Sequence, residues 1–251
     1  MGTSQSSKGP TSGTPLVPPW ADDRNRSPLP VPAEAARFRS FRKAISTFAS
    51  SGNTTKLRQA IGHYARTASG GSAIAARRMG SVTQAGGALF SALKGSSDTS
   101  SEVTINIDEL SGLPCEAAIS SITNALLTED GDSDKIRIAM NHALSEALDG
   151  VEIFDVKHIT DEVIINTMIN YLSECIFLHI VSEAGKSWNY SDSVSQAIKA
   201  EIDLRELVKV IVDKHLAQKF SGNIQSLTNT QIVKIQRQAV IDVWKEWESY
   251  K

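Results

Sequence analysis

The sequence predicts an all-α protein of about eight helices, preceded by a disordered N-terminal tail rich in Gly, Pro and Ser. Two observations lead to this class. From residue 33 onward, apolar residues recur every three or four positions, which is the spacing of one buried helix face. Residues 1–32 hold few core-forming residues, and six of the eight prolines of the chain lie between Pro15 and Pro32. Burial in this tail therefore cannot offset the entropy lost on ordering it.

Composition divides the chain into four segments. A disordered tail with a Pro-rich anchor covers residues 1–32, a basic helical region covers 33–95, a polar linker covers 96–106, and an acidic helical domain covers 107–251. Residues 1–100 carry 13 Lys and Arg against 4 Asp and Glu, for +9, whereas residues 101–251 carry 13 against 24, for −11. This asymmetry indicates either a partner for the basic half or docking of the two halves on each other.

Three helices are expected in the basic region, over about residues 32–51, 54–69 and 73–93. Pro32 suits a helix start, because the N–H that it lacks would have no partner in a first turn. Two readings are open for Gly70, Gly71 and Ser72. They form a turn between two helices, or they hold an anion at the start of the next helix.

Five further helices are expected in the acidic domain, over about residues 114–127, 133–148, 160–184, 191–220 and 227–250. The helix at 160–184 is apolar on most sides, which predicts a buried central helix. In the helix that follows Ser191, the residues that we expect to face inward are Val194, Ile198, Ile202, Leu207, Val208, Ile211 and His215. Residues 105–110 alternate apolar and polar too briefly to predict more than a short strand or an extended entry.

The sequence contains no constellation of residues typical of an active site. Its two cysteines, Cys115 and Cys175, do not make a disulfide framework, and no Cys and His cluster has zinc spacing. Cys175 and His179 share a face of the apolar helix, where a buried structural role is favoured over a reactive thiolate. We therefore expect a protein that is not an enzyme and that holds no cofactor and no metal.

The sequence also indicates a compartment. No positively charged stretch followed by roughly 7–15 apolar residues opens the chain, as a secretory signal would. The longest apolar run, Ile176–Val181, is far shorter than the roughly 20 residues of a membrane span. These features and the two unpaired thiols predict a cytoplasmic protein without membrane contact.

A candidate basic docking face is formed by five arginines of the basic region: Arg37, Arg39, Arg42, Arg77 and Arg78. Arginines with aromatic neighbours are also typical of a nucleic-acid footprint. Phe38 and Phe41 share one helix face, however, so they are expected in the core rather than as stacking platforms for bases. We therefore favour a solvated face that docks an acidic partner, and we keep a nucleic-acid-binding sensor as the alternative function.

The tail contains two features of interest. Gly2 permits removal of Met1 and leaves an unhindered α-amine, with a pKa of about 8, that is a usable nucleophile. Residues 1–6 also fit the N-myristoylation pattern, which is short enough to match by chance. Further along, the apolar block Leu16–Trp20 is suited to docking on a partner or on this protein's own surface.

Several stretches carry a resemblance to a known family. They are MGTSQSSKGP at the start, GTPLVPPWADD over residues 13–23, and FRSFRKAISTFASSGN followed by LRQAIGHYARTASGGSAIAARRMGS over residues 38–81. They resemble the QatB proteins of bacterial Qat anti-phage defence systems. The resemblance is most specific in the tail and over residues 38–81, whereas the acidic helices fit by length and helicity only.

The resemblance implies a non-catalytic component of a four-gene system. Its companions would be a P-loop ATPase, a protein similar to the deazaguanine-forming enzyme QueC, and a nuclease similar to TatD. Relatives of the QueC-like protein in other defence systems join a deazaguanine to an N-terminal glycine, which implies Gly2 as the acceptor here. If trimming came first, Gly9 or Gly13 would be the acceptor instead. The tail residues expected to contact a partner are Thr3, Ser4, Gly9, Pro10, Leu16, Val17, Pro18, Pro19 and Trp20.

Overall fold

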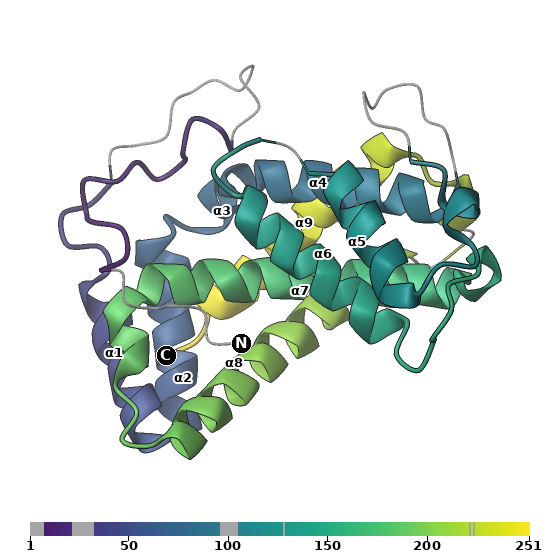
Figure 1. Cartoon of the computed structure of the whole chain (residues 1–251). Helices are drawn as coiled ribbons and strands as arrows, with labels where there is room; N and C mark the ends of the chain where they lie inside the picture. The colour runs from purple at the N-terminus through teal and green to yellow at the C-terminus, as the bar shows by residue number, and fades with distance from the viewer. Residues whose placement is uncertain (1–7, 22–32, 96–104, 128, 221, 223) are drawn as a thin grey trace. The chain divides into compact units, whose positions relative to one another are not determined.

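The computed structural model is mostly helical over the residues that it describes (Figure 1). These are residues 8–21, 33–95, 105–127, 129–220, 222 and 224–251. Within them lie nine α-helices and six short 3₁₀ or π segments, together with a single β-bridge between Pro114 and Ile153. The predicted all-α class is therefore confirmed.

The first two helices form a hairpin in which α1 (Arg39–Ser51) packs on α2 (Thr54–His63). Gly52, with φ of 67°, ends α1 in the left-handed conformation that favours glycine. The side chain of Asn53 then caps α2 by accepting from the N–H groups of Thr55 and Lys56. The first helix starts later than expected, because residues 35–38 form a turn in which Ala36 has φ of 57°. Pro32 lies outside the described residues.

The helix expected over 73–93 is in fact two. A π segment, η1 (Tyr64–Ala68), leads to α3 (Ser72–Arg78) and then to α4 (Gly80–Leu93). The break falls at Met79, where φ of −89° and ψ of 18° leave the helical region. Gly70 and Gly71 do separate helices, as predicted, and both have positive φ.

The remaining elements run from η2 (Ile107–Leu110) through α5 (Cys115–Ala125), α6 (Ser133–Ala147), η3 (Val156–His158), α7 (Asp161–Ala184), η4 (Gly185–Asn189), α8 (Val194–Leu216), η5 (Ala217–Phe220) and η6 (Ile224–Ser226) to α9 (Asn229–Glu248). The expected short strand at 105–110 is instead the 3₁₀ turn η2, capped by the Asn106 side chain. The other helices lie close to their predicted positions.

The inward face predicted for α8 is wrong in the first half of the helix. Val194, Ile198 and Ile202 are 78%, 54% and 56% exposed. Further along, Val208 and Ile211 are buried as predicted, together with Leu204. The helix carries two apolar stripes, and spacing alone does not tell which of them meets the core.

The described chain divides into two compact units. Unit 1 comprises the described residues up to Met79, with Ile176–Ile211 and Val240–Lys251, and unit 2 comprises Gly80–Cys175 and Val212–Ala239. The long helices α7, α8 and α9 each supply residues to both units. For this reason the units differ from the four consecutive segments that composition indicates, and residues 96–104 of the expected linker lie outside the described part.

The core of unit 1 is an aromatic cluster. The ring centroid of Tyr64 lies 5.0 Å from that of Phe41 and 6.1 Å from that of Trp244, and Trp247 lies 5.0 Å from Trp244. The indole N–H of Trp244 donates to the Ser69 hydroxyl over 2.8 Å. Both tryptophans are almost fully buried, so they form part of the core rather than its edge.

Unit 2 is closely packed where α4 meets α9. A Cβ at Gly86 would overlap the Gln236 side chain, and one at Gly87 would lie 2.5 Å from Asn229 Oδ1 and 2.8 Å from Val233 Cγ2. These glycines inside α4 therefore allow close approach of another helix.

The apolar helix α7 is a buried helix, as predicted. Taken with its continuation to Asn189, it is long and apolar enough to cross a membrane. However, 83% of its most apolar window is buried inside the protein, which is the property of a core helix.

Candidate functional site

The described part of the tail packs on unit 1. We call residues 8–21 the N-terminal strap. It has no helix or strand and is held by two turns, in which Thr14 donates to the Thr11 carbonyl and Ala21 donates to the Pro18 carbonyl, each over 3.1 Å. The composition thus correctly predicts a lack of regular structure here, but the strap is fastened to the body rather than free.

Two glycines allow the strap to approach the end of α7. Gly9 has φ of +69°, and a Cβ there would lie 2.6 Å from Arg42 Nη2 and 3.1 Å from the Ser182 carbonyl oxygen. On the side of the body, directly after α7, a Cβ at Gly185 would lie 2.7 Å from the Lys8 carbonyl oxygen. Neither position has room for a larger residue, so backbone meets backbone at this point.

Arg42 links the strap to α7. Its Nη2 donates to the Pro10 carbonyl over 2.8 Å, and its Nε and Nη2 donate to the Glu183 carbonyl over 3.0 and 2.9 Å. The guanidinium carbon also lies 4.8 Å from the Phe38 ring centroid. A cation on a carbonyl of the last helical turn is also favoured by the helix dipole.

Arg37 holds the strap at a second point. Its Nη1 donates to the Thr14 carbonyl over 2.6 Å. Its guanidinium carbon lies 4.6 Å from the centroid of the Phe38 ring. Arg37 is only 2% exposed. Burial, and next the charge of Arg78, lower the pKa of Arg37 from its ordinary value.

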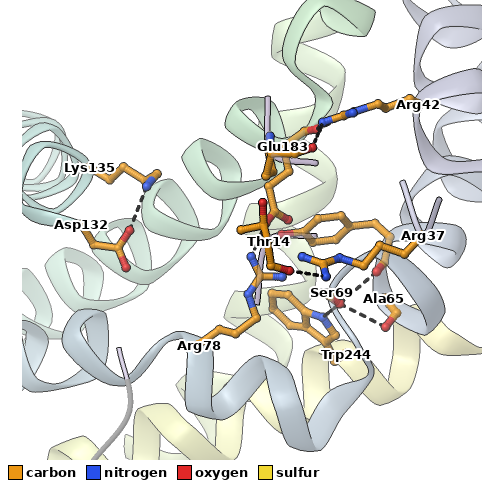
Figure 2. A network of polar contacts seen from close by, with 12 residues as sticks. Thr14, Arg37, Arg42, Ala65, Ser69, Arg78, Asp132, Lys135, Glu183 and Trp244 are labelled. Carbon is orange, nitrogen blue, oxygen red and sulfur yellow. Dashed lines mark hydrogen bonds and ion pairs between the residues drawn. The ribbon is translucent and has the colours of Figure 1, made fainter. Parts of the chain in front are cut away.

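One carboxylate balances this group of cations. The side chain of Glu183 pairs with Arg78, and both side chains are almost completely buried (Figure 2). The carboxylate contacts Arg78, whereas Arg42 binds the Glu183 backbone carbonyl and Arg37 binds the Thr14 carbonyl. The carbonyl oxygens of Pro10 and Thr14 supply the acceptors that a second or third carboxylate would otherwise provide. We call Arg37, Arg42, Arg78 and Glu183 the clamp.

Apolar contacts complete the attachment. Leu16, Val17 and Ala21 are 9%, 8% and 2% exposed. A Cβ at Gly70 would lie 2.9 Å from Leu16 Cδ2, which shows that Leu16 packs directly on the turn before α3. The strap is thus fixed by two arginines along its first half and by buried side chains along its second.

The space beside the clamp is small. A cavity of about 10 Å³ is lined by Arg78, His179, Ser69, Tyr64 and Trp244, among others. This volume accommodates about one water molecule. The clamp is therefore an arrangement that holds a segment of backbone in place.

Comparison with known proteins assigns the chain. The family model described as "Qat anti-phage system associated protein QatB" matches residues 70–246, which is more than two thirds of the 251 residues. The chain belongs to the QatB family. It is accordingly a component of an anti-phage defence system. No curated protein and no solved structure matches it.

The QatB family match lies mostly outside the stretches that carried the resemblance. It overlaps residues 38–81 only from residue 70 onward and covers most of the acidic helices. The strap and the α1–α2 hairpin precede the matched range.

Two of the predicted basic-face residues are in the wrong place for a docking face. Arg37 and Arg78 are buried, Arg42 and Arg77 are half-buried, and Arg39 is exposed. The prediction of one exposed face is wrong because Arg37, Arg42 and Arg78 turn toward carbonyl oxygens and Glu183 instead. Their charges act inside unit 1.

The predicted tail residues fall into three groups. Gly2, Thr3 and Ser4 lie outside the described residues. The strap holds Gly9, Pro10, Leu16 and Val17 against unit 1. Pro18 is half-buried, while Pro19 and Trp20 are exposed, Trp20 to 50%.

The start of α3 does hold an anion, and it belongs to this chain. The Glu248 carboxylate accepts from the N–H of Ser72 over 2.7 Å. Both predictions for residues 70–72 therefore apply. The stretch is a turn between two helices, and the N–H of Ser72, which has no partner within α3, donates to a carboxylate.

The cysteines occupy positions unsuited to nucleophilic chemistry. Cys115 and Cys175 are both buried free thiols. Burial raises the pKa of each, strongly for Cys175, so the thiolate is disfavoured. In the described part of the chain, no group of three or more His, Cys, Asp or Glu could hold a metal ion.

Sequence reasoning did not single out Glu183 or assign a role to Gly185. A signal was present for both. Glu183 is an acid in an apolar helix, and a buried carboxylate requires a cationic partner. Gly185 directly follows that helix and has a positive φ of 54°, which glycine adopts easily. Because Gly185 has no side chain, Gly9 can lie close to it.

Proposed function

We propose that this QatB-family protein is a non-enzymatic, cytoplasmic component of its defence system that presents its N-terminal tail to a QueC-like partner, with the Gly2 α-amine as the acceptor. The observation that carries the proposal is the strap. The clamp fixes the chain at Pro10 and Thr14, so the tail leaves unit 1 from a defined point.

The strap limits where the modifying enzyme can act. Gly2 is six residues before Lys8, the first residue of the strap. Six residues of fully extended chain span at most about 20 Å. The active site of the QueC-like protein must therefore come within that distance of the strap, or the strap must be released.

Packing around Gly9 and Gly13 supports Gly2 as the acceptor. The backbone nitrogen of Gly9 lies against Gly185, where a Cβ would be 2.8 Å from it, so a group joined to that nitrogen would force the strap away from the end of α7. Gly13 is exposed, and a Cβ there would meet only the Thr11 hydroxyl, at 3.9 Å. Acceptance at Gly13 would first require removal of Pro10, which Arg42 binds.

Intact-protein mass tests the modification. The full chain is co-expressed with the QueC-like partner and compared with a Gly2 deletion and with Gly13→Ala. We expect one discrete added mass in the unaltered chain and in Gly13→Ala, located on the N-terminal peptide, and none in the Gly2 deletion. An unchanged mass beside an active partner would contradict the proposal.

The body also offers a surface for a partner such as the P-loop ATPase. The exposed stripe of Val194, Ile198 and Ile202 on α8 is apolar, and such patches are typical of protein contacts. We expect the double change I198D and I202D to abolish co-purification with the ATPase, while Ile138→Asp, at an isoleucine 39% exposed on α6, leaves it intact. Retained co-purification in the double variant would exclude this surface.

The alternative of a nucleic-acid sensor has less support. Its basic face relied on Arg37 and Arg78, which are buried. Phe38 and Phe41 are buried as well and cannot stack on bases.

A further inference from the structure

A polar groove runs between α1 and α2, on the hairpin of unit 1. Its volume is about 300 Å³. The polar side chains that line it are Ser40, Lys43, Thr47, Lys56, Gln59 and His63. It is separate from the clamp, none of whose residues lines it.

The same spacing on both helices brings these side chains together. On α1 they occupy positions 40, 43 and 47, and on α2 they occupy 56, 59 and 63, which in each case is i, i+3 and i+7. Such positions share one face of a helix. Each helix also has an apolar face, which includes the buried side chain of Phe41 on α1 and of Leu57 on α2. The polar side chains lie on a different face of each helix, beside the groove.

The groove is cationic. Two lysines line it and no acid does. The sequence contains no Asp or Glu from Ala35 to Ser97, so neither helix supplies a carboxylate nearby. Lys43 is exposed, and within the described residues its amine has no hydrogen-bond or ion-pair partner. A cation without a partner can bind an external anion without first breaking an internal contact.

The remaining groups are hydrogen-bond donors. The amine of Lys56 donates to Gln59 Oε1 over 3.0 Å, which leaves the NH₂ group of Gln59 as a donor. Burial, and next the charge of Arg66, lower the pKa of His63, so its imidazole is neutral near neutral pH and offers one N–H. Ser40 adds a hydroxyl, whereas the Thr47 hydroxyl donates to the Lys43 carbonyl over 3.0 Å.

We propose that this groove binds the phosphate group of a small phosphorylated ligand of nucleotide size. Two ammonium groups and several neutral donors suit an anion with several oxygen atoms. The volume lies at the lower end of the range for small-molecule sites. No Phe, Tyr or Trp side chain lines the groove, so it lacks the large stacking platforms that are typical of single-stranded nucleic-acid sites. This inference is independent of the role proposed for the tail.

Calorimetric titration of the full chain tests the site with three probes: inorganic phosphate, ATP and a short single-stranded oligonucleotide. We expect phosphate and ATP to bind. The double variant K43A and K56A should weaken ATP binding by about tenfold or more, because charge-assisted hydrogen bonds are lost. The matched control Lys186→Ala, at an exposed lysine of η4 in the same unit, should bind as the unaltered chain does.

Three outcomes would overturn the proposal. In the first, neither phosphate nor ATP binds the unaltered chain. In the second, ATP binds equally well to the double variant and to the control. In the third, only the oligonucleotide binds and Lys43→Ala weakens it, which would assign the surface to nucleic acid. Thermal unfolding shows whether the double variant is folded, and Lys43→Ala alone, at an exposed side chain, provides a second variant in which weaker ATP binding is expected.

Discussion

The clamp and the groove differ in how they use positive charge, although both draw on α1. The clamp turns Arg42 toward the Pro10 and Glu183 carbonyls, whereas the groove displays the next residue, Lys43, to solvent. Consecutive residues on a helix point about 100° apart. Net charge along a sequence therefore does not distinguish a structural cation from one available to a ligand, and what each cation contacts must be known.

The largest effect is expected from the anion of the clamp. Glu183→Gln removes the carboxylate that pairs with the buried guanidinium of Arg78 and whose charge also acts on Arg37 and Arg42. Breaking a buried pair of this kind costs about 3–5 kcal/mol, because an uncompensated charge remains. Urea unfolding would measure it.

The matched control for the carboxylate is Glu206→Gln, at an exposed acid of α8. We expect its free energy of unfolding to stay within about 0.5 kcal/mol of the unaltered chain. Equal unfolding of both variants would show that the clamp is not an internal charge network.

A smaller effect is expected at the point where the strap meets α7. Gly9→Ala places a Cβ in a left-handed conformation and 2.6 Å from Arg42 Nη2. We expect a loss of about 1–3 kcal/mol, together with faster trypsin cleavage at Lys8 as the strap lifts. Gly13→Ala is the control, since its only close atom would be 3.9 Å away. Equal cleavage in the two variants would count against the close approach at Gly9.

The smallest effect concerns pH and the groove. The pKa of His63 in the folded protein is lowered from 6.5 by burial and by Arg66. The contribution of neutral His63 is therefore present above pH 6.5 and is lost as pH falls through the lower folded pKa. We expect the pH dependence of stability in this acidic range to be shallower in His63→Gln. Superimposable stability profiles would contradict the pKa shift.

The sequence predicts much of the fold because apolar spacing is strong in most helices. The helices at 54–63 and 161–184 begin within one residue of their predicted starts at 54 and 160. Two errors have physical causes. The helix breaks at Met79, which is itself neither Gly nor Pro, although Gly80 follows it. The helix α8 has two apolar stripes, and the one that contains Val194 is exposed.

The site was predicted only in part. Its residues Gly9, Pro10, Arg37, Arg42 and Arg78 were all named, but in two unrelated roles, as a tail and as a basic face. The contact between them is non-local, because Arg42 and Glu183 are 141 residues apart. Helical periodicity describes one face of one helix and carries no information about which distant segment that face meets.

The account depends most directly on the strap being held by arginines. Hydrogen exchange of the Thr14 and Ala21 amides, which donate to the Thr11 and Pro18 carbonyls, measures this in the full chain. We predict slow exchange in the unaltered chain, fast exchange in the double variant R37Q and R42Q, and slow exchange in the control Arg39→Gln, at an exposed arginine of the same helix. Exchange at the rate of an unfolded peptide in the unaltered chain would contradict the account.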